Sequence, residues 1–93
     1  MNKVYKYTVL LNAYVEVFLP SQARILRVDT QDDGASNRIQ IWALVEVGAP
    51  FALRKLRIAG TGHPIQNSSL DLYYINTFTM KHGALWLHAF EII

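Results

Sequence analysis

The feature that most constrains the fold is a two-residue alternation of apolar and polar side chains that recurs along the whole chain. Successive side chains of a β-strand point to opposite faces, so this period is typical of strands that cover a core with one face. β-Branched and aromatic residues fill the alternating runs, whereas apolar spacing of three and four never extends beyond a turn or two. The pattern predicts an all-β protein.

Turn-forming residues divide the alternation into about seven short segments, the number typical of a small β-sandwich. No repeat, low-complexity tract or linker interrupts them, so we expect residues 1–93 to form a single β domain. A sandwich and a small barrel both fit this pattern. The expected strands, mostly antiparallel, cover residues 3–10, 14–19, 23–30, 38–47, 53–59, 70–80 and 84–92.

Two connections predict hairpins. Residues 31–37 contain Asp, Gly and Asn, which tolerate a positive φ and form tight turns between antiparallel strands. Residues 81–83 form a short turn between the last two segments. Segment 38–47 is apolar on both faces, with Ile41 and Trp42 pointing opposite ways, and is therefore expected at the centre of a sheet.

The alternation also assigns side chains to faces within segment 23–30. Leu26 and Val28 are expected to point into the core, whereas Arg24 and Arg27 are expected near solvent.

The composition indicates a partner. The chain has 93 residues, of which 52% are hydrophobic and 17% charged. A positive mean hydropathy in so short a chain implies more apolar surface than one small core can hide. We expect part of that surface to contact another protein or a second copy of this chain in a homodimer.

Charge and cysteine content restrict the class of protein further. The net charge of +2, from nine Lys and Arg against seven Asp and Glu, is too small to predict nucleic-acid binding. The absence of cysteine excludes disulfides and thiolate chemistry and is typical of a reducing compartment. The sequence has neither a long apolar leader nor a run of about 18 apolar residues. These features predict a cytoplasmic protein that does not cross a membrane.

One loop with its preceding basic segment is the candidate binding site. Its glycines allow backbone N–H groups to surround an anion, and the bases before it add positive charge. The loop matches neither a Walker motif nor a dinucleotide fingerprint, so a structural turn and a phosphate-binding loop both remain open. Strand alternation separates the three bases between two faces, which favours solvated charges. The candidate residues are Arg54, Lys55, Arg57, Thr61, Gly62, His63 and Pro64.

The sequence predicts no enzyme, metal site or cofactor. The three histidines lack the spacing of zinc ligands. His88 alternates in phase with Trp86 and Phe90, which predicts a packed aromatic face with a ring nitrogen bonded to backbone. No nucleophile elbow and no placeable pair of acid and base is present. His63 is the one group that its loop position and imidazole side chain single out for acid–base chemistry.

The aromatic residues are expected to serve the core first and a protein interface second. Tyr73 and Tyr74 are adjacent, so one of them faces away from the core of a regular strand. Outward aromatic side chains are typical anchors of protein interfaces, and stacking of single-stranded bases is a weaker alternative.

Three motifs carry a family resemblance: Trp42-Ala43-Leu44-Val45, the Gly-Thr-Gly-His-Pro loop and the His-Ala-Phe-Glu ending at 88–91. With them the chain resembles a family of small phage and prophage proteins without an assigned activity. It departs from that family at Val47-Gly48, where Asp-Pro usually follows the central strand, and in a longer turn at 32–37. The resemblance implies an accessory protein that acts in the cytoplasm of a bacterial host.

These observations predict a non-enzymatic binding module that inhibits or modulates a host protein, for example one of an immune system, as anti-CRISPR proteins do. The alternative is a small-ligand binder that sequesters a phosphate-bearing nucleotide through loop 60–64.

Overall fold

The computed structural model describes residues 1–66 and 71–93, and within them it contains seven β-strands and no α-helix. This confirms the predicted all-β fold, and most strand ends lie within two residues of the predicted ones. Leu70, the expected start of the sixth strand, lies outside the described residues. The strands are β1 Asn2–Leu10, β2 Tyr14–Pro20, β3 Arg24–Asp29, β4 Arg38–Glu46, β5 Phe51–Gly60, β6 Leu72–Met80 and β7 Leu85–Ile92.

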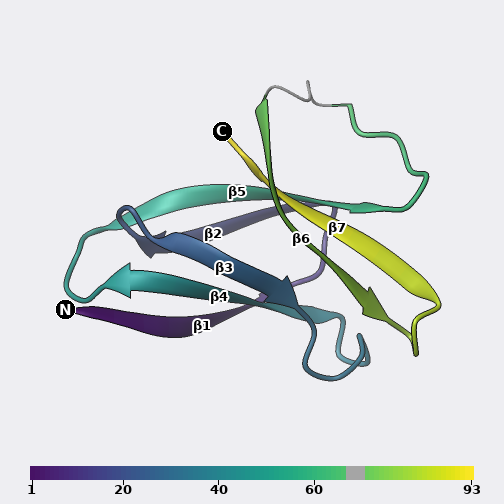
Figure 1. Cartoon of the computed structure of the whole chain (residues 1–93), viewed down its shortest axis with the longest axis horizontal. Helices are drawn as coiled ribbons and strands as arrows, with labels where there is room; N and C mark the ends of the chain where they lie inside the picture. The colour runs from purple at the N-terminus through teal and green to yellow at the C-terminus, as the bar shows by residue number, and fades with distance from the viewer. Residues whose placement is uncertain (67–70) are drawn as a thin grey trace.

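The strands form two antiparallel sheets that pack as a small sandwich (Figure 1). One sheet has the order β1-β4-β3 and the other the order β2-β5-β7-β6. The predicted central position of segment 38–47 is confirmed, because β4 lies between β1 and β3. Both expected hairpins are also confirmed, since β3 pairs with β4 and β6 pairs with β7. In residues 1–66 and 71–93 no helix is long and apolar enough to span a membrane.

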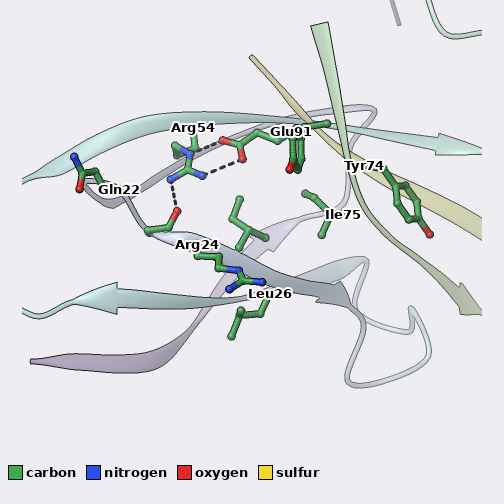
Figure 2. A pocket seen from close by; sticks show the side chains of 10 residues that line it. Gln22, Arg24, Leu26, Arg54, Tyr74, Ile75 and Glu91 are labelled. Atoms are coloured by element: carbon green, nitrogen blue, oxygen red, sulfur yellow. Dashed lines mark hydrogen bonds and ion pairs between the residues drawn. The ribbon is translucent and has the colours of Figure 1, made fainter. Parts of the chain in front are cut away.

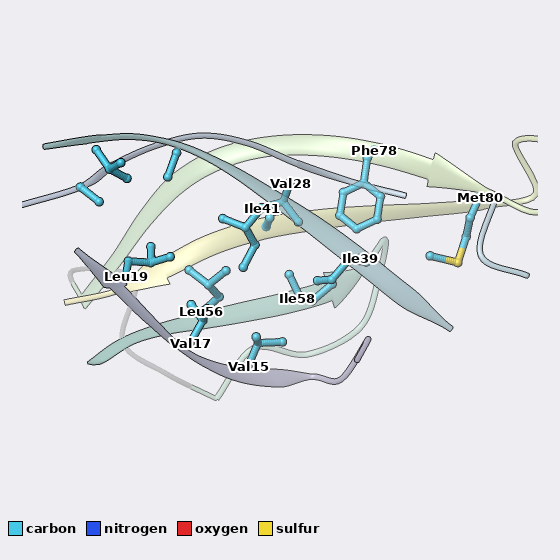
Figure 3. Packing of buried hydrophobic residues seen from close by; sticks show 14 residues of the cluster. Val15, Val17, Leu19, Val28, Ile39, Ile41, Leu56, Ile58, Phe78 and Met80 are labelled. Carbon is cyan, nitrogen blue, oxygen red and sulfur yellow. The ribbon is translucent and has the colours of Figure 1, made fainter. Parts of the chain in front are cut away.

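The core lies between the sheets, and in β2 and β4 it follows the alternation of the strand (Figure 3). β4 contributes its odd-numbered residues, whereas Trp42 points to the opposite face, as predicted. Burying one large aliphatic side chain contributes about 1.5–3 kcal/mol, so this cluster dominates the stability of the fold. The largest fully buried side chains are Leu19, Val28, Ile39, Ile41, Val45 and Leu56.

A β-bulge changes the faces of β3. Its register with β4 shifts between Ile25 and Arg27, so Leu26 is the extra residue. The prediction that Leu26 points into the core is wrong: Leu26 is exposed, and Ile25 packs against the core instead. Val28 is fully buried, as predicted.

The loop between β3 and β4 owes its shape to short polar residues. Asp33, Gly34 and Asn37 adopt the positive φ values that the sequence led us to expect. The Asp32 carboxylate accepts hydrogen bonds from the backbone N–H groups of Gly34 and Ser36. Hydrogen bonding by Ser36 and its neighbours lowers the pKa of Asp32.

The two sheets are joined at their edges by polar contacts as well as by the core. Asn76 of β6 bonds both backbone groups of Val28 on β3: its Oδ1 accepts from the N–H at 2.8 Å, and its Nδ2 donates to the carbonyl at 2.8 Å. Nearby, the Asp33 carbonyl accepts from Lys81 N at 3.1 Å, and the Asp33 carboxylate accepts from His82 N at 2.7 Å. The loop of one sheet is thereby tied to the hairpin turn of the other.

We expect Asn76→Ala to destabilise the protein by about 2–4 kcal/mol, because both backbone groups of the buried Val28 lose their partner. Chemical denaturation followed by tryptophan fluorescence measures this loss. Gln31→Ala is the control, because it removes an exposed amide that bonds only Lys6, and it is expected to change stability by less than about 0.5 kcal/mol. Equal effects of the two substitutions would contradict the role assigned to Asn76.

Candidate functional site

Arg54 is held by the protein itself. Its guanidinium donates to both carboxylate oxygens of Glu91 on β7, and its Nη1 donates to the Ala23 carbonyl at 2.8 Å. Such a two-pronged pair is strong and directional. The hydrogen bond to Glu91 raises the pKa of Arg54. Arg54 therefore joins β5, β7 and the start of β3 and offers few donors to a ligand.

Arg57 is buried, with 8% of its surface exposed. Its Nη1 donates to the carbonyls of Ala13 and Ile58, and its Nη2 donates to the Pro64 carbonyl at 3.2 Å. The guanidinium also lies 5.0 Å from the centre of the Tyr14 ring. The expectation that Arg57 is a solvated charge is wrong, because Tyr14 and the segment after β5 pack against the outward side of the strand.

The three predicted bases consequently do not form one basic patch. Of Arg54, Lys55 and Arg57, Lys55 alone is exposed, and it has no ion-pair partner in residues 1–66 and 71–93.

Residues 60–63 form a tight turn in which Gly62 supplies the positive φ and Gly60 lies against the His63 ring. His63 N donates to the Gly60 carbonyl at 3.1 Å, and Gly62 has a φ of 82°. A Cβ on Gly60 would lie 2.8 Å from Nδ1 of His63, so the imidazole packs where a side chain would stand. Thr61 N donates to the Trp86 carbonyl at 3.2 Å. Two N–H groups of the loop are thus already used within the protein.

His88 lies in a chain of hydroxyl groups on the outward face of the same sheet. Its Nε2 is 2.7 Å from Oγ1 of Thr61, and its Nδ1 is 2.9 Å from Oγ1 of Thr77. Thr77 in turn bonds the Tyr74 hydroxyl at 2.8 Å. The prediction of a backbone partner for His88 is wrong, because the neighbouring strand and the loop present side-chain hydroxyls to both ring nitrogens. The chain fastens loop 60–64 to β6 and β7.

A polar cleft of about 530 Å³ opens between β3 and β6 (Figure 2). The Arg54–Glu91 pair lies in the cleft, Arg24 and Leu26 line one side, and Tyr73 lines the other. The sequence offered no signal for this cleft, because its lining comes from four separate segments of the chain. Glu91 is paired with Arg54, which leaves Arg24 as an exposed base on one side of the cleft.

Exposed aromatic side chains cover the outward face of the β2-β5-β7-β6 sheet. The register aligns Tyr14, Arg57, Phe90 and Tyr74 in one row across the four strands. The rings of Tyr74 and Phe90 pack edge to face, with their centroids 5.8 Å apart. We define the aromatic face by four aromatic residues on it that are each at least half exposed: Tyr14, Phe18, Tyr74 and Trp86.

Strand alternation accounts for part of this face. Val15 and Val17 are buried, so the intervening residues of β2 point outward by alternation. The adjacent Tyr73 and Tyr74 point to opposite faces of β6, and both are exposed, because Tyr73 lines the cleft and Tyr74 lies on the outward face.

In residues 1–66 and 71–93 no three His, Asp or Glu side chains gather as metal ligands. Residues 1–93 match a family model described as Domain of unknown function (DUF7352). The chain belongs to this family. No curated protein and no solved structure matches it.

We expect Arg57→Glu to lower the free energy of unfolding by about 3–5 kcal/mol, since it places an uncompensated buried carboxylate among carbonyl oxygens. Lys55→Glu, on the exposed neighbour, is the control; it sets a second carboxylate opposite Glu16 and should cost less than about 1 kcal/mol. Differential scanning calorimetry of both variants measures the difference. If Arg57→Glu is as stable as the wild type, the hydrogen bonds of the guanidinium to the carbonyls of Ala13, Ile58 and Pro64 do not stabilise the fold.

Proposed function

We propose that this DUF7352 domain is a non-enzymatic module that binds another protein through the aromatic face. The observation that carries the proposal is that Tyr14, Phe18, Tyr74 and Trp86 are at least half exposed on one side of one sheet. Large aromatic side chains are enriched at the energetic centres of protein interfaces, where they bury much area from few rotatable bonds.

Several of these rings are held in place before any partner binds. Tyr14 lies against the Arg57 guanidinium, and Tyr74 is held by the Phe90 ring and the Thr77 hydroxyl. Trp86 Nε1 donates to the Gly83 carbonyl at 3.1 Å. A side chain that is already ordered loses less conformational entropy on association, so it contributes more to affinity.

The resemblance to phage proteins supplies the class of partner. On that basis we propose that the module acts in the cytoplasm of a bacterial host and inhibits or modulates a host protein, such as a component of an immune system. Inhibition by occupancy requires a stable surface contact and no catalytic group. In the polar cleft, the carboxylate of Glu91 is paired with Arg54, which agrees with such a mechanism.

The alternative, a loop that sequesters a phosphate-bearing nucleotide, has less support. Of the candidate loop residues, Thr61 and His63 donate their N–H groups to protein carbonyls, and Pro64 has none. Arg54 and Arg57 are engaged within the fold. Lys55 is the exposed base that remains for an anion.

The proposal is tested by purification of the tagged protein from bacterial cells, followed by native mass spectrometry and reconstitution of any complex from purified components. We expect a stoichiometric complex with one host protein. The variant Phe18→Ser/Trp86→Ser should weaken it by about 100-fold or more, because truncating a hot-spot aromatic residue costs about 2 kcal/mol or more.

Val47→Ser is the matched control, since Val47 is an exposed apolar residue at the end of the other sheet. It should leave the complex intact. A protein that retains a nucleotide and no host partner would instead support the ligand-binding alternative.

A further inference from the structure

The four edge strands of the two sheets differ in how they avoid pairing with other chains. An open edge is a template for strand addition, and bulges, prolines and short length discourage it. β3 and β6 each contain a bulge, and Asn76 closes part of their shared edge. β2 has seven residues and ends at Pro20.

β1 has none of these features. It has nine residues without Pro or Gly, and its register with β4 is unbroken from Asn2 to Leu10. Its other side pairs with no strand in the described part of the chain. Lys3 and Lys6 are its only charged residues, and Lys6 is turned toward Gln31, whose Oε1 accepts from it at 2.9 Å.

The side chains of β1 leave apolar surface at this open edge. Val4 and Leu10 point away from the core and are 54% and 61% exposed. Tyr7 and Val9 pack against the core, but Tyr5 on the same face is exposed. The edge therefore combines unpaired backbone groups with apolar side chains on both faces of the sheet.

We propose that β1 pairs antiparallel with β1 of a second copy, with Tyr7 on the two-fold axis. A two-fold axis perpendicular to the sheet keeps the cores of both copies on the same side of the joined sheet. Such an axis passes through one residue, which then lies opposite itself in the second copy, because a shift by one residue would exchange the faces. The axis at Tyr7 sets Val4 opposite Leu10 of the second copy, and Tyr5 opposite Val9.

The neighbouring registers are worse. An axis at Lys6 places the two Lys6 ammonium groups opposite each other, and like charges directly opposite are destabilising. An axis at Tyr5 leaves Leu10 without a partner and sets Val4 against Lys6. An axis at Thr8 leaves Val4 and Tyr5 uncovered. The Tyr7 register alone among these covers every exposed apolar side chain of the strand.

Pairing at β1 joins two three-stranded sheets into one continuous sheet. The aromatic face lies on the other sheet, so it stays free in both copies. The dimer therefore presents two copies of the aromatic face. Its formation through β1 does not depend on the proposed host partner. Two linked sites raise the avidity for a partner that is itself dimeric or clustered.

Sedimentation equilibrium over a concentration series tests the dimer. We expect the wild type to dimerise and Val4→Lys to raise the dissociation constant by about tenfold or more, because the substitution acts at both ends of the two-fold interface. The variant Val4→Lys/Leu10→Glu should recover the wild-type constant, since each lysine then faces a glutamate of the other copy.

The variant Val4→Lys/Leu10→Lys is the matched control, because it changes the same two positions but sets lysine opposite lysine in the Tyr7 register. It should not recover dimerisation. A monomeric wild type, a Val4→Lys variant that dimerises normally, or equal recovery by the two double variants would each overturn the proposal.

Cross-linking gives a second readout that does not depend on affinity. The chain contains no cysteine, so Val4→Cys and Leu10→Cys each carry a single thiol at an exposed site that does not affect the core. Directly opposite residues bring their Cβ atoms to about 4.5–5.5 Å, close to the reach of a disulfide. Under mild oxidation, a mixture of the two variants should yield mainly the mixed disulfide. Random pairing of the thiols would overturn the register.

Discussion

The arrangement of the two sheets depends on the contact between Asn76 and Val28. Each sheet is complete in its own hydrogen bonding except at its edges, and apolar packing alone does not determine how two twisted sheets lie against each other. The Asn76 amide matches one backbone donor and one backbone acceptor of β3, as a paired strand would. The β-bulge before it turns the amide inward. Together with the contacts of Asp33 to Lys81 and His82, this side chain holds the two edges against each other.

The same edge explains why the cleft and the aromatic face lie on different sides of the molecule. Beyond the Asn76 contact, β3 and β6 separate, and the Arg54–Glu91 pair lies in the space between them (Figure 2). The bulge that turns Asn76 inward leaves Tyr74 outward, beside Phe90. The extra residue, Ile75, thus places Asn76 where it joins the two sheets and leaves Tyr74 on the surface proposed for binding.

The basic residues show how tertiary contacts change the meaning of a sequence cluster. Arg54, Lys55 and Arg57 are adjacent in the chain, but each has a different environment: an ion pair, solvent and a set of backbone carbonyls. Arg57 lies over the Tyr14 ring and donates a hydrogen bond to the Pro64 carbonyl. Its charge therefore stabilises the fold and helps to order the aromatic face. In the neighbouring turn, Gly62 has a positive φ, and the His63 ring packs against Gly60.

The sequence by itself determined the all-β class, the strands with their turns, and the core faces of β2 and β4, because these follow from local alternation and turn chemistry. Only the tertiary structure decided the faces of Leu26 and Tyr74, the partners of His88 and the burial of Arg57. A bulge shifts the alternation by one residue without a signal in composition. Hydrogen-bond partners such as Thr61 and Thr77 come from distant segments, and their positions depend on how the sheets and loops pack together.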